Sequence, residues 1–382
     1  MWLASLLVSH PLYKPVCICM QWQAKQHLSH IHLLLHTYDI DPSKCETCAP
    51  ASRLPNSMHS ILTDIASSRE ESKEADTEDS TTLKVYTDGL GQDGMVGAAT
   101  VLYKGNVITG MLQYYLGSLE QHTTFEAELI GILLGLWLLH REPDADSVSP
   151  KANSQVAIQA LNMHRLGPGS HILDEIHELS ESLCINSISD LQLRVSWISG
   201  HDGVAGNESI DKEAKAAAKG DLSPCHKLPS LLQSNPLPFS TKAIKQHFRV
   251  KLAKEWHMLW EKSPHYQHAS KIDPKLPARS FLKLTREVSK SQASTVFQLR
   301  SKHVLLCKHL HRIGKVDSPL CTSCGHGEET MHYFLFECPT HEHARFKLGH
   351  KFGQLSQSLR HILGSQKALK PLLLYVRETE RF

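Results

Sequence analysis

Cysteine and histidine residues near the C-terminus have the spacing of a metal site. Cys321, Cys324, His332 and Cys338 form the pattern C-x2-C-x7-H-x5-C. Three thiolates and one imidazole are a complete tetrahedral ligand set for a structural Zn²⁺ ion, with no coordination position left for chemistry. The spacing therefore predicts a zinc knuckle that supports folding or contacts nucleic acid. Free cysteines without a metal are the alternative. Three other histidines are competing ligands: His311, His326 and His341.

Acidic residues in three distant stretches could support a different kind of chemistry. Asp88 follows a β-rich run, Glu128 lies in an apolar helical stretch, and Asp211 lies near the start of the last helical segment before a proline-rich stretch. Two-metal hydrolysis of a phosphodiester needs several carboxylates that converge on Mg²⁺ ions about 3.5–4 Å apart. Each acid taken alone is more typical of a solvated surface. Whether the three form one metal site depends on the elements that carry them.

Hydrophobic periodicity predicts those elements. Three β-rich runs at 83–87, 96–103 and 107–116 have short connections and predict an antiparallel meander. Apolar residues then recur at helical spacing from Phe125 to Leu139, after a possible capping box of Thr123 and Glu126. Helices are also predicted at 156–161 and 172–185, a strand at 191–198, and a last helix that Asn207 caps and that runs to Lys219.

The predicted order of elements is βββαβααβα, which indicates an α/β fold with a mixed five-stranded sheet and flanking helices. The segment 144–151 would supply the remaining strand. It is a poor candidate for a central strand, because Pro150 cannot donate a hydrogen bond to a ladder.

The contexts of the three acids resemble type 1 ribonuclease H, in particular the version carried by fungal non-LTR retrotransposons. The resemblance covers about residues 81–220 and rests on three blocks: Tyr86-Thr-Asp88-Gly, Phe125-Glu-Ala-Glu128-Leu, and Trp197-Ile-Ser-Gly-His201-Asp-Gly-Val-Ala-Gly-Asn207-Glu-Ser-Ile-Asp211. It implies a ribonuclease H-like sheet and endonucleolytic cleavage of RNA in RNA/DNA hybrids. By this resemblance Asp88, Glu128 and Asp211 would hold Mg²⁺ or Mn²⁺, and His201 would assist proton transfer or product release. Glu126 is the rival of Glu128.

One position departs from the family pattern. The family has a fourth Asp where this chain has Asn153, in the run Lys151-Ala-Asn153-Ser-Gln. A neutral amide cannot replace the charge of a carboxylate that bridges two dications. We therefore expect the fold to persist and hydrolysis to be impaired. A noncatalytic nucleic-acid-binding protein with the same fold is the alternative, and the block from His201 to Asp211 disfavours a third, an integrase or transposase relative.

The surroundings of the cysteine cluster point to the same origin. Gln298-Leu-Arg300, Leu310-His-Arg-Ile-Gly314 and Glu329-Thr-Met-His332 resemble the zinc-binding tail downstream of ribonuclease H in these retroelements. The first 63 residues look like the connection that follows a polymerase module. The resemblance implies a retroelement-derived protein with a mainly helical C-terminal region and a small zinc knuckle.

Charge separates the chain into two blocks of opposite sign. Residues 81–221 carry 9 Lys and Arg against 18 Asp and Glu, a net charge of −9, and residues 240–315 carry 17 against 4, a net charge of +13. Binding a hybrid through its phosphates requires cations, so the second block is the predicted source of affinity. A cationic solvent-facing surface on ordinary helices is the alternative. The candidate nucleic-acid-binding residues are Lys242, Lys245, Arg249, Arg300 and Arg312.

Length and composition set the remaining expectations. The chain has 382 residues, 41% hydrophobic and 21% charged, which indicates a folded protein of two or three domains. No apolar run approaches the roughly 18 residues of a membrane span, and Met1–Val8 lacks the basic start of a signal peptide, so we expect an intracellular protein. The expected parts are a leader with an acidic linker (1–80), the ribonuclease H-like domain (81–221), a proline-rich link (222–239), a basic helical region (240–315), the zinc knuckle (316–345) and a C-terminal helix (346–382).

Overall fold

The chain has two compact units. The computed structural model describes residues 39–47, 61–142, 148–163, 167–186, 193–200, 205–233, 236–275, 279–350 and 352–381. The first unit covers residues 1–249 and the second covers residues 250–382. Each unit has a hydrophobic core of its own.

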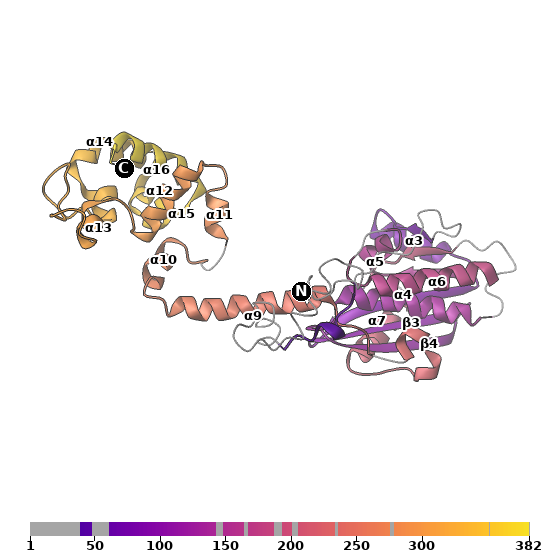
Figure 1. Cartoon of the computed structure of the whole chain (residues 1–382). Coiled ribbons are helices and arrows are strands. Elements are labelled where there is room, and N and C mark those ends of the chain that lie inside the picture. The colour runs from indigo at the N-terminus through magenta and orange to yellow at the C-terminus, as the bar shows by residue number, and fades with distance from the viewer. Residues whose placement is uncertain are drawn as a thin grey trace, which may run out of the picture. The chain divides into compact units, whose positions relative to one another are not determined.

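A six-stranded mixed sheet forms the centre of the first unit (Figure 1), with the order β1-β6-β5-β2-β3-β4. The strands are β1 Leu62–Asp64, β2 Leu83–Gln92, β3 Met95–Lys104, β4 Val107–Ser118, β5 Val148–Ala152 and β6 Arg194–Trp197. As predicted, β2, β3 and β4 are an antiparallel meander, whereas β1, β6, β5 and β2 run parallel. The predicted five strands are therefore present. The sixth, β1, comes from the stretch expected to be an irregular leader.

Helices cover both faces of this sheet. The helices are α3 Arg69–Glu78, α4 Thr124–His140, α5 Gln155–Leu161, α6 Ser170–Asn186 and α7 Ala205–Ala218. Side chains alternate between the faces of a strand. Val85 of β2 accordingly belongs to the core with α4, while the adjacent Tyr86 packs with Ile210 of α7. The helices α4 and α7 therefore lie on opposite faces of the sheet.

Two local predictions about these helices had different outcomes. The capping box is present, because Thr123 Oγ1 accepts from the Glu126 backbone and the Glu126 carboxylate accepts from the Thr123 backbone. Asn207 was expected to cap the last helix, but α7 already includes Ala205 and Asn207 lies inside it, buried. The prediction for Asn207 was therefore wrong by at least two residues.

Strand β5 contains the proline that made this segment a poor candidate for a central strand. Pro150 lies opposite Val85 of β2 and is buried. The expectation was wrong because β6 pairs only with Lys151 and Ala152 of β5. Pro150 lies before the start of that ladder, so no β6 carbonyl needs a donor from it.

The acidic stretch, which the sequence indicated to be a helix end or a linker, is helix α3, and polar contacts hold it to the sheet. Ser68 caps it, and Ser72 Oγ donates to the Trp197 carbonyl at 3.0 Å. Lys151 of β5 is 4% exposed and forms ion pairs with Asp76 and, at 2.7 Å, with Asp79. Burial opposes ionisation of Asp79, but hydrogen bonds from Lys151 and other donors outweigh it and hold the pKa of Asp79 below its ordinary value.

Replacing this buried cation should be strongly destabilising. Lys151→Met leaves two carboxylates without their partner, so we expect the free energy of unfolding to fall by about 3–5 kcal/mol in urea denaturation at pH 7. The folded-state pKa of Asp79 is lowered, so its contribution is present above its unfolded pKa of about 3.9 and is lost as the pH falls below that value. The wild type should therefore lose more stability than Lys151→Met between about pH 5 and pH 3. Lys104→Met, at an exposed position on β3, is the control, and an equal effect of the two substitutions would contradict the prediction.

The proline-rich stretch 222–239 packs against the first unit instead of forming a free link. It contains a 3-10 turn at Cys225–Lys227 and helix α8 at Ser230–Gln233. Leu228, Leu232 and Leu237 join the main core.

The second unit is helical. Helix α9, Thr241–Glu261, begins in the first unit, and the helices that follow are α10 Tyr266–Ile272, α11 Ser280–Leu284, α12 Lys290–Ser301, α13 Cys307–Arg312, α14 Glu342–His350, α15 Leu359–Gly364 and α16 Gln366–Thr379. The single C-terminal helix expected at 346–382 is thus the end of α14 followed by α15 and α16. Phe334 and Tyr375 pack in the core of this unit. Among the described helices, none is both long enough and apolar enough to cross a membrane.

Candidate functional site

Asp88 and Asn153 are neighbours because their strands are paired in register. The parallel ladder between β2 and β5 ends with Thr87 opposite Ala152, and Asp88 and Asn153 are the next residues. Asp88 is 4% exposed. The Asn153 amide Nδ2 donates to Asp88 Oδ1 at 2.6 Å, while Asn153 Oδ1 is buried with no hydrogen-bond partner. The residue that departs from the family pattern therefore contacts the first predicted metal ligand directly.

Glycine at position 89 allows Glu128 to approach the same point. A Cβ atom on Gly89 would lie 2.2 Å from both the Ala127 carbonyl carbon and the Glu128 nitrogen. Helix α4 therefore packs directly on the backbone of β2. Further along α4, a Cβ atom on Gly131 would lie 3.0 Å from the Asp88 carbonyl oxygen, a contact so tight that the backbone would have to shift by a few tenths of an ångström.

The surroundings of the Glu128 carboxylate favour the binding of a cation. Glu128 Oε2 is buried without a hydrogen-bond partner. Burial and then the neighbouring Asp88 raise the pKa of Glu128 well above its ordinary value, against a smaller opposing effect of a backbone hydrogen bond from Gly89. A divalent ion between Asp88 and Glu128 would reverse this shift by favouring the charged form. Binding of the ion would then release a proton and weaken as the pH falls.

Glu126, the rival of Glu128, has a structural role. The two hydrogen bonds that its carboxylate accepts from Thr123 belong to the cap of α4. Burial raises the pKa of Glu126 to about 7, although hydrogen bonds from Thr123 oppose the shift. The rival acid is therefore occupied at the start of the helix, and Glu128 remains as the acid beside Asp88.

Asp211 forms an ion pair with a lysine of its own helix. It lies on α7, and its Oδ2 accepts from Lys215 at 2.5 Å, an i,i+4 ion pair on the helix surface. Within the described ranges, the three acids do not form a group whose oxygens all lie within 4.8 Å of one another. His201 lies outside the described residues. The structure thus gathers Asp88, Glu128 and Asn153, and pairs Asp211 with Lys215.

The predicted nucleic-acid-binding residues fall into two groups. Lys242, Lys245 and Arg249 are exposed along α9. Arg300 is instead mostly buried: its Nη2 donates to Asp273 at 2.8 Å and its Nη1 to the Leu363 carbonyl at 3.2 Å. Arg312 is exposed on α13. The guanidinium group of Arg300 therefore uses these hydrogen bonds to stabilise the second unit and is not placed to bind a phosphate.

Three of the four predicted zinc ligands converge. The sulfur atoms of Cys321, Cys324 and Cys338 all lie within 4.8 Å of one another, and those of Cys321 and Cys338 are 3.8 Å apart. Burial raises the pKa of Cys321 to about 12. A hydrogen bond with the Tyr333 hydroxyl at 3.0 Å lowers the pKa of Cys324 to about 6, which favours its thiolate. The donor set suits Zn²⁺, whose structural sites are rich in thiolates.

The predicted fourth ligand lies apart from these cysteines. The side chain of His332 is 59% exposed, and its Nδ1 is 2.7 Å from Glu337 Oε1. His341, ranked lower from the sequence, is 6% exposed, and its Nε2 is buried without a hydrogen-bond partner. Neither imidazole belongs to the group of sulfur atoms in the part of the chain that the structure describes.

Comparison with known proteins concerns the first unit. Residues 80–219 match the family model for RNase H. One similar solved structure is the N-terminal RNase H domain of rv2228c from Mycobacterium tuberculosis, fused to maltose-binding protein, with 16% identity, 37% of this chain and 95% of that chain covered, and a TM-score of 0.29. Another is RNase H1 from the halophilic archaeon Halobacterium salinarum NRC-1, with 18% identity, 36% and 98% covered, and a TM-score of 0.28. A search of curated proteins gave no match. By the family match, residues 80–219 are similar to RNase H, and the structure gives them a mixed sheet with flanking helices.

Proposed function

We propose that this protein is a retroelement-derived ribonuclease that acts on the RNA strand of RNA/DNA hybrids, with hydrolysis weakened by Asn153. The observation that carries this proposal is the contact between Asn153 Nδ2 and Asp88 Oδ1 at 2.6 Å. In it, an amide occupies a carboxylate oxygen that a metal ion would need. The retroelement origin rests on the sequence blocks around Asp88, Glu128 and Asp211 and on those around the cysteines.

Asp88 and Glu128 would hold the ions, together with Asp211 once it is released from Lys215. Bound Mg²⁺ would activate a water molecule and stabilise the leaving oxygen of the phosphodiester. Three carboxylates neutralise only part of the charge of two dications, and Asn153 adds none. The amide must also leave Asp88 before an ion can use Oδ1. Both effects lower the affinity for the ions, so cleavage should need more Mg²⁺ than a site with four carboxylates.

The test is a cleavage assay of the purified full chain on an RNA/DNA hybrid across a range of Mg²⁺ concentrations. We expect slow cleavage of the RNA strand that rises with Mg²⁺ and shows no saturation near about 1 mM. Asp88→Asn should abolish cleavage and leave hybrid binding unchanged, because the basic second unit supplies the affinity. Cleavage by Asp88→Asn at the wild-type rate would contradict the proposal.

A noncatalytic hybrid-binding protein is the second candidate, and the ion pair between Asp211 and Lys215 favours it. In that case the wild type binds the hybrid and no Mg²⁺ or Mn²⁺ concentration produces cleavage. The same assay therefore separates the two functions.

We further propose that Cys321, Cys324 and Cys338 hold a structural zinc ion, with His332 as fourth ligand. His332 is exposed and contacts Glu337, so for this role its imidazole would have to turn away from Glu337 toward the sulfur atoms. The closed ligand set gives the ion a role in folding and none in hydrolysis.

A further inference from the structure

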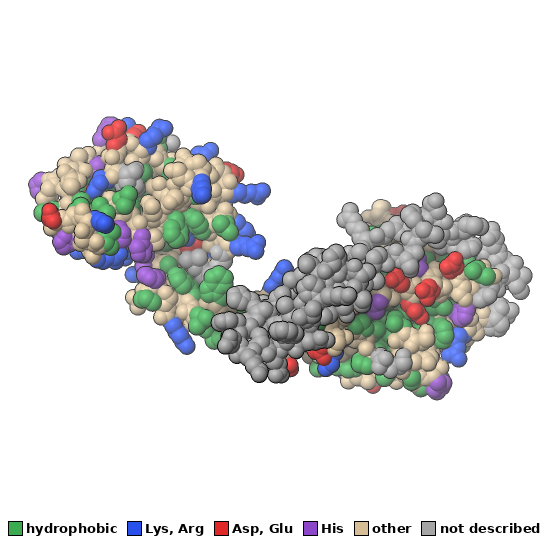
Figure 2. Space-filling model, in the orientation of Figure 1, with side chains coloured by type: hydrophobic (Ala, Val, Ile, Leu, Met, Phe, Trp, Pro, Cys, Tyr) green, Lys and Arg blue, Asp and Glu red, His purple; other side chains and the backbone are tan. Residues whose placement is uncertain are grey.

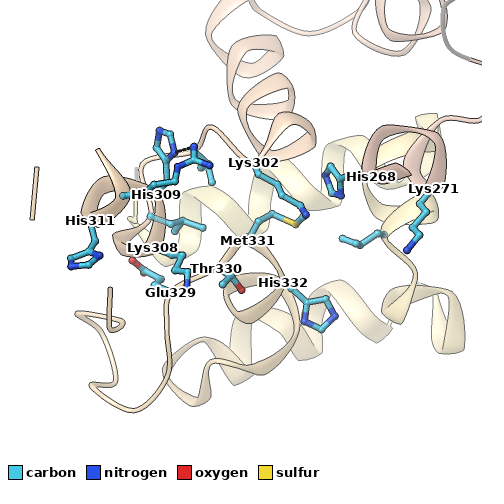
Figure 3. Close-up of a pocket in the computed structure, with 14 residues that line it drawn as sticks. His268, Lys271, Lys302, Lys308, His309, His311, Glu329, Thr330, Met331 and His332 are labelled. Carbon is cyan, nitrogen blue, oxygen red and sulfur yellow. Dashed lines mark hydrogen bonds between the residues drawn. The ribbon is translucent and has the colours of Figure 1, made fainter. Parts of the chain in front are cut away.

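A basic cavity of about 720 Å³ lies in the second unit, and all of its lining residues belong to that unit. Lys271 of α10, Lys302 after α12, and Lys308 and Arg312 of α13 line it (Figure 3). Its volume is within the range of about 300–1,000 Å³ that is typical of small-ligand sites.

The positive charge of this cavity is not neutralised from within. Among the described residues that line it, the only carboxylate is that of Glu329, which is 0% exposed and is held by Arg381, which donates to both of its oxygens. Lys308 is paired with Glu328 at the surface. In the described part of the chain, no carboxylate forms an ion pair with Lys271 or Lys302. On the face shown in Figure 2, Lys, Arg and His side chains also outnumber acidic ones over this unit.

Lys302 occupies a backbone conformation that normally selects glycine. It is the C-cap residue that directly follows α12, with φ of 61° and ψ of 13° in the left-handed region. A lysine there is strained where glycine would not be. Such an outlier is a reason to look for a function of the side chain, and the side chain of Lys302 lines the cavity.

The cavity also offers flat rings and an apolar floor. Val304, Leu306 and Met331 supply apolar surface. The ring of His268 is fixed by a contact of 3.0 Å between its Nε2 and the Arg300 carbonyl, and that of His309 by a contact of 2.9 Å between its Nδ1 and Arg312. Burial, and then nearby cations, lower the pKa of both histidines, so the rings are neutral at pH 7. Neutral imidazole faces can stack on bases.

We propose that this cavity binds a single strand of nucleic acid, with Lys271 and Lys302 on its phosphates and His268 and His309 against its bases. A cationic groove combined with ring faces is the usual arrangement for single-strand binding without sequence preference. An acidic peptide would satisfy the lysines but would leave the rings and the apolar floor without a matching partner. The proposal goes beyond hydrolysis, since it requires none of the carboxylates of the first unit.

The test measures binding of the full chain to a fluorescent oligothymidylate of about 12 nucleotides by anisotropy, over a range of salt concentrations. DNA is not cleaved in the proposed reaction and no divalent ion is added, so failure of the proposed function would not affect the result. The variant is Lys271→Gln with Lys302→Gly. We expect about tenfold weaker binding near 0.1 M salt, and a slope of log affinity against log salt that is smaller by about 1.4, for two phosphates.

The substitution at position 302 keeps the result interpretable. Glycine suits the left-handed conformation, so Lys302→Gly alone should melt at or above the wild-type temperature. The control removes two exposed cations of the same unit outside the cavity, by Lys290→Gln with Lys367→Gln. Equal binding by the two double variants would overturn the proposal. It would also be overturned if polyglutamate displaced the oligothymidylate as effectively as unlabelled strand, because the cavity would then bind any polyanion.

Discussion

Asn153→Asp should raise the Mg²⁺-dependent rate of RNA cleavage in a hybrid by about 100-fold or more over the wild type. The substitution removes the amide donor from Asp88 Oδ1 and adds a carboxylate beside it. The site would then offer four negative charges to two dications, with the new ligand already adjacent to Asp88 and close to Glu128. The measurement is the single-turnover rate on a hybrid at fixed, saturating protein.

The same substitution should destabilise the protein when no metal is present. Asp88 and the new Asp at position 153 would be like charges at hydrogen-bond distance, next to the buried Glu128. We expect a loss of about 1–3 kcal/mol without Mg²⁺ and its recovery at high Mg²⁺, followed by thermal melting. Asn153→Ala is the matched control, because it removes the amide hydrogen bond to Asp88 Oδ1 without adding charge. If Asn153→Asp cleaves no faster than Asn153→Ala, the added charge has no effect on the rate. The proposal that Asn153 weakens hydrolysis by lacking a carboxylate would then be wrong.

Removal of zinc should unfold the cysteine-rich part of the second unit. Structural zinc sites contribute apparent binding free energies of about 10–16 kcal/mol at pH 7, which exceeds the stability of a typical domain. Cys321 and Cys338 are both buried, in the unit whose core contains Phe334 and Tyr375. We expect a strong chelator, or Cys338→Ser, to abolish the cooperative thermal transition of this unit and to release bound zinc.

Controls for this prediction come from the same chain. Cys225→Ser, at an exposed cysteine of the first unit, should change neither zinc content nor melting. His332→Ala should lower the zinc affinity and His341→Ala should not. The opposite result would assign the fourth position to His341, whose Nε2 is buried and unpaired. A protein that contains no zinc and melts identically with and without chelator would exclude a metal here.

The order of elements could be predicted from the sequence because it depends on local patterns. The first run of the meander alternates and the next two are β-rich, and α4 has both a long apolar run and a capping box. The strand β1 could not be found this way. It is three residues long, and its partner β6 lies about 130 residues further along the chain. Helix α3 was also missed, since Ser72 is its only buried residue and polar contacts, not an apolar face, attach it to the sheet.

The candidate site was only partly accessible to the same reasoning. The family motifs located Asp88 and Glu128, and the ladder of β2 with β5 then placed Asn153 against Asp88, a contact that no spacing in the sequence indicates. The pairing of Asp211 with Lys215 had a signal in the sequence, since acid and base are four residues apart on a helix. The buried position of His341 had none.

The ion pairs of Lys151 limit where this chain can be truncated. Both of its partners, Asp76 and Asp79, precede residue 80, where the family match begins. A fragment trimmed to that match would bury an ammonium group with no counter-ion two positions from Asn153, on the strand that aligns the candidate site. Weak activity in such a fragment would report the missing helix α3 and not the chemistry of the asparagine.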